Sequence, residues 1–167
     1  MQDHSAGGLR LFKANLSACF PTGNGDDRAY IWQSHATETI VSAMLLEMIE
    51  REGARRFVIH SGKKNGLLLW VFNPDLRYSS SSADYSVSEQ RAMKVFFQDI
   101  PDVESLLQPE TGKSASFSLE ELHLSASIFE RVVGSLRLSH ETLPASARTF
   151  REWDVGFLKR FEKVVAR

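Results

Sequence analysis

The chain has 167 residues, of which 43% are hydrophobic and 25% are charged. These fractions are ordinary for a globular protein that is long enough to bury one sizeable core, and they exclude an intrinsically disordered chain. The 20 basic and 21 acidic side chains nearly cancel. Because no overall positive charge attracts phosphate groups, we expect no direct binding of nucleic acid.

The content of cysteine and of long apolar segments indicates where the protein resides. Cys19 is the only cysteine, which excludes an intramolecular disulfide, a cysteine-rich secreted scaffold and a structural zinc site. No apolar run approaches the roughly 20 residues that span a bilayer. Residues 1–8 lack the basic and apolar regions of a signal peptide. We therefore expect a cytoplasmic or nuclear protein with no membrane partner.

The N-terminal part begins with a polar, glycine-bearing segment, residues 1–8, which we expect to be loose. Hydrophobic residues then alternate roughly over residues 9–19, which predicts a strand. Residues 21–27 are dense in turn-forming residues and predict an exposed loop. The aromatic residues that follow, around Trp32, indicate that ordered structure resumes.

The clearest predicted element is a helix that begins near Thr37, a plausible N-cap, and ends near Gly53, a plausible C-cap. Its apolar residues recur at the spacing that places them along one stripe of a helix. They are Ile40, Val41, Met44, Leu45, Met48 and Ile49.

A β-hairpin is predicted next, with strands over residues 55–60 and 67–72 joined by a turn. The second strand is apolar at every position, which is typical of a central strand covered on both faces. It runs directly into Asn73-Pro74-Asp75, which predicts a turn that projects from the sheet. Residues 78–86 are rich in serine and predict a mobile connection.

Residues 93–97 alternate between apolar and other side chains, which favours a strand, although Ser86 with Glu89 forms the capping-box pattern of a helix. Residues 101–116 predict an exposed connection. A second helix is indicated from Ser127 to just before Pro144 by an apolar stripe. The stripe consists of Ile128, Val132, Val133 and Leu136.

A last strand is predicted over residues 152–157. The elements together predict an α+β fold, with a mixed or antiparallel sheet of about five strands and two packed helices. We expect a single domain over residues 9–167.

Few residues carry recognisable chemistry. Cys19 could act as a nucleophile that accepts ubiquitin, but its apolar neighbours favour a small buried side chain. The histidines do not have the spacing of metal ligands on one helix or turn, so we expect no metal and no cofactor. They are His4, His35, His60, His123 and His140. Trp153 and Phe161 are candidates for a protein contact surface, against the alternative that both lie in the core.

Two segments carry a resemblance to a known family. They are residues 70–78, from Trp70 through the Asn-Pro-Asp motif to Tyr78, and residues 143–158, from Leu143-Pro144 through Trp153 to Leu158. In these segments the chain resembles the HECT-like proteins that bind ubiquitin-conjugating enzymes. Family proteins tend to be longer, so the chain resembles their C-terminal part. The resemblance implies binding of a ubiquitin-conjugating enzyme, with ubiquitin-ligase activity as a further implication.

One feature departs from the true HECT ligases, which carry a catalytic cysteine in a Leu-Pro-x-Ala-x-Thr-Cys-Phe context. The nearest segment here starts at Leu143-Pro144, and Thr149 occupies the position of the cysteine. A threonine hydroxyl cannot accept ubiquitin by thioester exchange. The first hypothesis is therefore an interaction module without its own nucleophile, which contacts its partner through Asn73-Pro74-Asp75 and the segment around Trp153.

Two alternatives stay open. The first is a ubiquitin ligase that forms a thioester on Cys19. The second follows from the resemblance, because some members of the family are linked to the cleavage and polyadenylation of pre-mRNA. This alternative is an adaptor for the endonuclease of that machinery.

Overall fold

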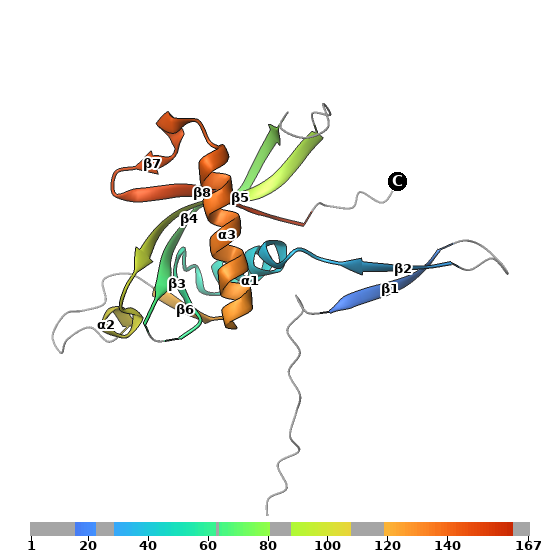
Figure 1. Ribbon diagram of the computed structural model, residues 1–167, viewed down its shortest axis with the longest axis horizontal. Helices are drawn as coiled ribbons and strands as arrows, with labels where there is room; N and C mark the ends of the chain where they lie inside the picture. Colours follow the sequence, from blue (N-terminus) through green and yellow to red (C-terminus); the bar gives the residue numbers. More distant parts are fainter. Residues whose placement is uncertain (1–15, 23–28, 63, 81–87, 108–118, 162–167) are drawn as a thin grey trace, which may run out of the picture. The chain divides into compact units, whose positions relative to one another are not determined.

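The computed structural model describes residues 16–22, 29–62, 64–80, 88–107 and 119–161, and the chain divides into two compact units, residues 1–36 and 37–167 (Figure 1). In the described ranges no helix has the length and hydrophobicity to cross a membrane. The elements are β1 (Ser17–Thr22), β2 (Ala29–Ser34), α1 (Thr37–Glu52), β3 (Arg56–His60), β4 (Gly66–Ser80), β5 (Ser88–Ile100), α2 (Val103–Leu107), β6 (Leu119–His123), α3 (Ala126–Thr142), the short 3-10 helix η2 (Ala145–Ala147), β7 (Thr149–Phe150) and β8 (Trp153–Lys159).

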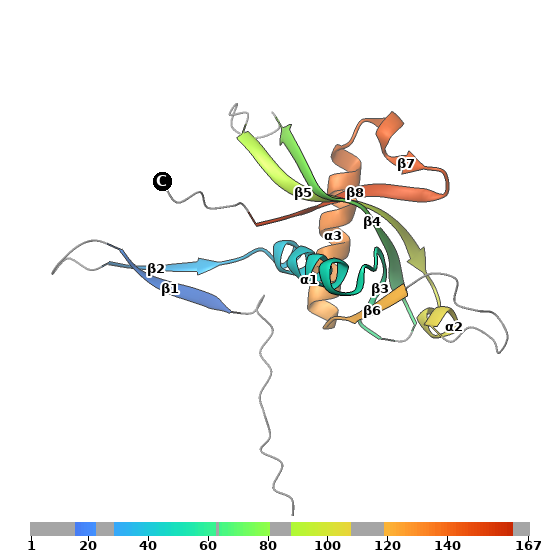
Figure 2. The ribbon, with the colours of Figure 1, turned by 180° about the vertical axis from the view of Figure 1, so that it is seen from behind.

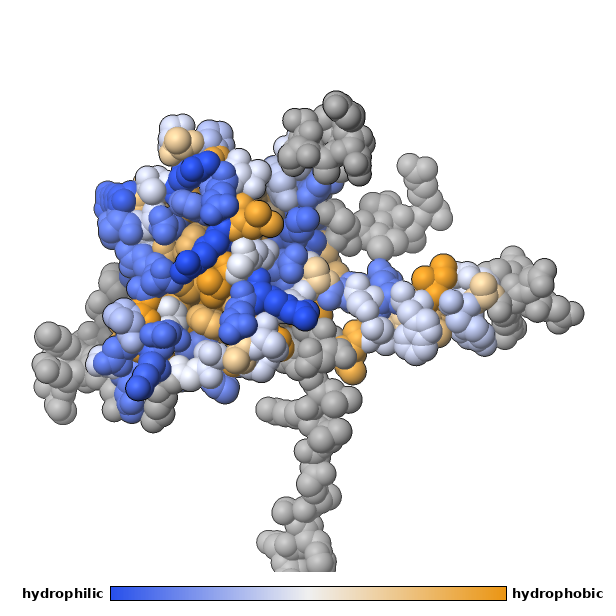
Figure 3. Space-filling model, viewed as in Figure 1, coloured by the Kyte–Doolittle hydropathy of each residue, from blue (hydrophilic) through white to orange (hydrophobic). Residues whose placement is uncertain are grey.

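The first unit contains an antiparallel hairpin of β1 and β2, in which Cys19 lies opposite Trp32 and Phe20 opposite Ile31. Opposite residues share a face, so apolar side chains are exposed on both faces of this ribbon, and hydrophobic residues are visible along it in Figure 3. Residues 17–19 of the strand predicted over residues 9–19 lie in β1, which begins at Ser17. Residues 9–15 lie outside the described part. The loop predicted from Pro21 starts later, since β1 continues to Thr22.

The second unit contains a six-stranded sheet with the order β6-β3-β4-β5-β8-β7. β3 and β6 are parallel, and the other neighbouring strands are antiparallel, so the sheet is mixed. The α+β class and the mixed sheet are confirmed. The predicted numbers of about five strands and two helices are wrong, because β6, β7 and the short helix α2 have no clear local pattern in the sequence.

The two long helices are confirmed close to their predicted limits. α1 begins at Thr37, and Gly53 ends it with a φ of 69°, while its N–H donates to the carbonyl of Ile49 at 2.9 Å. This left-handed conformation is one that glycine adopts without steric cost. α3 begins after Ser125 and ends at Thr142. Leu143, the residue before Pro144, is extended, because proline disfavours a helical conformation in its predecessor.

The core lies between one face of the sheet and the helices α1 and α3, which both pack against β8 (Figures 1 and 2). Alternate residues of β4 point into it, and Leu67, Leu69 and Val71 are at most 1% exposed. α3 approaches β8 closely at Gly156, where a Cβ atom would lie 3.1 Å from the carbonyl oxygen of Leu136. Within the described residues, the long helices α1 and α3 lie on the same face of the sheet, so neither of them covers the centre of the opposite face.

β4 and β5 form the longest hairpin, whose far ends extend beyond the rest of the sheet (Figures 1 and 2). Two predictions are wrong here. Asn73-Pro74-Asp75 is not a turn, because it lies inside β4, and β4 is not covered on both faces, because Phe72 is 52% exposed. The favoured strand over residues 93–97 is confirmed as part of β5, so the alternative of a helix opened by Ser86 and Glu89 is excluded.

Candidate functional site

The Asn73-Pro74-Asp75 motif forms a bulged segment of β4. Gly66 lies opposite Ile100 and Ser80 opposite Ser88, and the 15 residues of β4 face the 13 of β5 with register shifts on both sides of Asn73. The backbone N–H of Asp75 donates to Oδ1 of Asn73 at 3.0 Å. This local turn replaces a bond of the ladder, which is how a strand accommodates a proline that has no N–H to donate.

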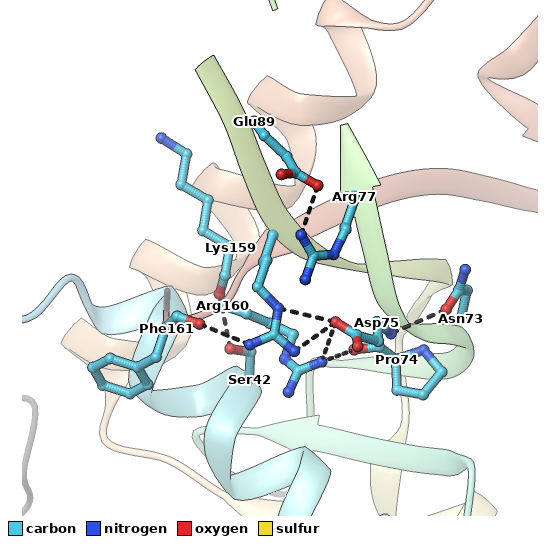
Figure 4. Close-up of polar contacts among 10 residues, drawn as sticks. Ser42, Asn73, Pro74, Asp75, Arg77, Glu89, Lys159, Arg160 and Phe161 are labelled. Carbon is cyan, nitrogen blue, oxygen red and sulfur yellow. Dashed lines mark hydrogen bonds and ion pairs between the residues drawn. The ribbon is translucent and has the colours of Figure 1, made fainter. Parts of the chain in front are cut away.

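The bulge directs Asp75 towards two arginines that come from distant parts of the chain (Figure 4). Arg91 of β5 donates to Oδ1 of Asp75 from Nη2 at 2.7 Å and from Nε at 3.1 Å. Arg160, just after β8, donates from Nη1 to the same oxygen at 2.9 Å and to the carbonyl of Pro74 at 2.7 Å. Hydrogen bonding from Arg91 is the main cause that holds the pKa of Asp75 below its ordinary value.

These contacts give the motif a structural role. The side chain of Arg91 is only 6% exposed, whereas that of Asp75 is 52% exposed. A buried guanidinium requires a carboxylate partner, so Asp75 connects β4, β5 and the segment after β8. A contact between Asn73, Pro74 or Asp75 and a partner protein stays a prediction.

The segment after β8 is held by backbone contacts. The carbonyl of Phe161 lies 3.5 Å from Nη1 of Arg91, and the carbonyl of Lys159 lies 2.8 Å from the hydroxyl of Ser42 on α1 (Figure 4). The side chain of Phe161 is exposed, so the alternative that it belongs to the core is not supported. Its role in binding stays a prediction.

A cluster of aromatic side chains occupies the sheet face opposite α1 and α3, and we call it the aromatic face. It consists of Trp70 and Phe72 on β4, Phe96 on β5, Phe150 on β7 and Trp153 on β8. The strand register explains the cluster, because Trp70 lies opposite Phe96, and Phe150 lies opposite Trp153. The ring of Phe150 stacks on that of Phe96, with centroids 5.0 Å apart and planes 10° apart.

The buried and exposed members of the aromatic face differ in role. Trp153 is 8% exposed and Phe96 is 2% exposed, so both belong to the core of this face. Trp153 packs edge-on against Trp70, and its Nε1 donates to Oε1 of Glu152 at 3.1 Å. The rings that reach solvent are Phe72, at 52% exposed, and Phe150, at 43%.

Neither Phe72 nor Phe150 was singled out from the sequence. The sequence contains a possible signal for Phe150, because only two residues separate it from Trp153. In a hairpin with a two-residue turn these two residues lie opposite one another, so their rings share a face. Phe72 has no comparable signal, because it continues the alternation of Leu68 and Trp70 in a strand that is apolar at every position, so the sequence does not indicate which of the two faces is exposed.

Cations lie over these rings at cation–π distances. Nζ of Lys94 is 5.7 Å from the ring centre of Phe72 and 5.8 Å from that of Phe96. Cζ of Arg151 is 5.6 Å from the ring centre of Phe150, and Cζ of Arg56 is 5.4 Å from that of Trp70. The aromatic face is therefore bordered by positive charge.

The other candidate residues do not belong to the aromatic face. Cys19 is exposed on the hairpin of the first unit. His60 and His123, which are far apart in sequence, lie with ring centres 5.2 Å apart because β3 and β6 are parallel, and Nε2 of His60 is 2.8 Å from Oε1 of Glu121. Even so, the described residues contain no group of three or more side chains that could hold a metal ion.

The comparisons with known proteins place the chain in a family. An uncharacterised protein of Schizosaccharomyces pombe is 26% identical over 165 residues, which cover 95% of this chain and 43% of that protein. The chain thus spans less than half the length of the curated relative it matches. No solved structure matches significantly. A family model described as HECT-like ubiquitin-conjugating enzyme (E2)-binding matches residues 1–155, so the chain belongs to this family.

Proposed function

We propose that this chain is a protein-interaction module that binds a ubiquitin-conjugating enzyme without forming a covalent bond to ubiquitin. The observation that carries the proposal is the family match over residues 1–155, which includes the first structural unit and most of the second. The aromatic face supports it, because aromatic rings and arginine, both present there, are side chains that are enriched at protein interfaces. Binding through such a surface requires no nucleophile.

Two observations support a mechanism without a thioester. Thr149, which stands at the cysteine position of the HECT pattern, is exposed on β7 and offers only a hydroxyl. The strands β1 and β2, which carry Cys19 and the residues opposite it, contain no histidine that could act as a base for the thiol and no lysine or arginine. The chain can position a ubiquitin-loaded conjugating enzyme near a client protein by contact alone.

The test combines a binding and a trapping measurement. The purified chain is titrated with a panel of ubiquitin-conjugating enzymes by isothermal calorimetry, and it is incubated with the ubiquitin-charged form of each. Saturable binding to at least one enzyme is expected, with equal affinity for the Cys19→Ser variant and with no thiol-sensitive ubiquitin adduct. A reducible adduct that disappears in Cys19→Ser would establish the ligase alternative, and absence of binding to every enzyme would contradict the proposal.

The specific conjugating enzyme, a link to the pre-mRNA endonuclease, and residence in the cytoplasm or nucleus remain predictions. Their test is affinity capture of the full-length protein from fractionated cells, followed by mass spectrometry. Enrichment of a conjugating enzyme supports the proposal. Enrichment of the 3′-end processing endonuclease in its place would favour the adaptor role.

A further inference from the structure

We propose that the aromatic face is the docking site for the ubiquitin-conjugating enzyme, and that the segment of the enzyme that docks there presents an apolar side chain flanked by carboxylates. This inference rests on the proposed function. It adds the surface and the chemistry of the partner to it.

The first argument is the combination of exposure and rigidity. Phe72 and Phe150 are about half exposed, yet both rest on Phe96, which is only 2% exposed. Phe150 stacks on Phe96, and the ring centre of Phe72 lies 5.1 Å from that of Phe96 and 6.1 Å from that of the partly buried Trp70. Rings held in this way lose little conformational freedom on binding. They offer a preformed apolar platform for a side chain of a partner.

The second argument is charge. Lys94 and Arg151 border the platform, and among the ion pairs of the described residues none includes either side chain. The chain as a whole has a net charge of −1, so this positive border is a local feature. Carboxylates on the partner would complement it and would also guide the encounter of the two proteins.

The third argument is the backbone of Arg151. Its φ of 56° makes it the one residue other than glycine, among those described, with a left-handed conformation. Arginine is disfavoured at such a position, where glycine or asparagine is usual. Strained residues of this kind gather at functional sites, and the turn places the guanidinium of Arg151 over the exposed ring of Phe150.

The same features favour a protein over a single-stranded nucleic acid. Nucleic-acid binding on a sheet requires bare ring faces on which bases stack. Here one face of the Phe150 ring is stacked on Phe96, and cations of the chain lie over Phe72, Phe96 and Phe150. A carboxylate can pair with these cations while an apolar side chain contacts the exposed ring edges.

The experiment measures the affinity of the full chain for the conjugating enzyme that binds it most tightly, by isothermal calorimetry. Phe72→Ala and Phe150→Ala are each expected to weaken binding by about tenfold or more, the loss typical of central interface aromatics. The matched control is Leu138→Ala, an exposed leucine on α3, which lies on the opposite side of the sheet. Its affinity is expected to stay within about twofold of wild type.

Charge reversal tests the chemistry of the partner. Lys94→Glu and Arg151→Glu are expected to weaken binding, and the affinity of the wild type is expected to fall as salt is added, because the contact includes opposite charges. Arg151 lies in an exposed turn, so its variant keeps the core intact even if Phe72→Ala lowers stability. Far-UV circular dichroism and thermal melting identify any variant that fails to fold.

The outcomes separate the two proposals. If the wild type binds no conjugating enzyme, the proposed function fails, and the docking site fails with it. If the wild type binds and the folded aromatic and charge variants bind equally well, the docking site alone is wrong. Binding of single-stranded RNA that the same variants abolish, without binding of a conjugating enzyme, would likewise overturn the inference.

Discussion

Removal of the Asp75 carboxylate tests the structural role of the bulge in β4. In Asp75→Ala, Arg91 loses two charge-assisted hydrogen bonds, of 2.7 and 3.1 Å. The side chain of Arg91 is only 6% exposed in the wild type, so water has little access to replace them. Breaking a fully buried ion pair by removing one partner costs about 3–5 kcal/mol. Because Asp75 is itself half exposed, solvent screens the pair, and we expect a loss of about 2 kcal/mol in the free energy of unfolding.

The matched control is Asp99→Ala. Asp99 also accepts two hydrogen bonds from an arginine, Arg137, each 3.1 Å, but the two side chains are 72% and 58% exposed. Such surface pairs contribute about 0–1 kcal/mol. Removing both Asp75 and Arg91, in Asp75→Ala with Arg91→Met, is expected to recover about 1 kcal/mol relative to Asp75→Ala alone, because the buried charge of Arg91 no longer lacks its partner.

Urea unfolding followed by far-UV circular dichroism measures all four proteins. The midpoint of Asp75→Ala should fall while the slope of the transition stays constant. The reasoning is refuted if Asp75→Ala unfolds at the same urea concentration as Asp99→Ala. It is also refuted if Arg91→Met makes the Asp75→Ala protein less stable still.

Three further predictions follow from single contacts. Because the pKa of Asp75 in the folded protein is lowered below 3.8, the stabilising contribution of its carboxylate is complete above that pH and is lost as the pH falls through the lower folded-state pKa. The difference in free energy of unfolding between wild type and Asp75→Asn should therefore narrow between about pH 5 and pH 2 in urea titrations, and a constant difference would contradict this. Gly156→Ala should destabilise the protein by about 1–3 kcal/mol, since the new Cβ would meet three atoms at 3.1 Å. Gly134→Ala in α3, where nothing lies within 4 Å, should stabilise it by about 1 kcal/mol. Thermal melting measures both, and equal shifts of the melting temperature would contradict the prediction. Ser139→Ala removes the hydroxyl that accepts a hydrogen bond from the backbone N–H of Phe157 at 2.8 Å, and it should lower the free energy of unfolding by about 1–2 kcal/mol, measured in urea. Amide hydrogen exchange at Phe157 should become faster, and an unchanged exchange rate would refute the bond.

The sequence predicted those parts of the fold that have a strong local pattern. The stripe from Ile40 to Ile49 and the stop at Gly53 were enough to locate α1, and the apolar run after Gly66 located the central strand. β6 could not be predicted in the same way, because Leu119–His123 is short and mostly polar and is a strand only through its pairing with β3. Pairing between distant segments leaves little trace in local periodicity.

The candidate site illustrates the same limit. Asn73-Pro74-Asp75 has the composition of a turn, and only the arginines at positions 91 and 160 reveal why it lies within a strand. Trp153, a candidate contact residue in the sequence, is 8% exposed and forms the floor of the aromatic face, while Phe72 and Phe150 reach solvent. Exposure depends on register and on bulges, which composition does not specify.

The contacts of Arg160 affect how this domain should be delimited in recombinant work. The family match ends at residue 155, in the middle of β8, whereas Leu158 is completely buried and Arg160 is bound to Asp75 and Pro74. A truncation at the family limit would remove the second half of a strand and one of the two cations that neutralise Asp75. Expression clones and fusion junctions should therefore extend beyond Phe161, or insoluble protein will be mistaken for a module that cannot fold.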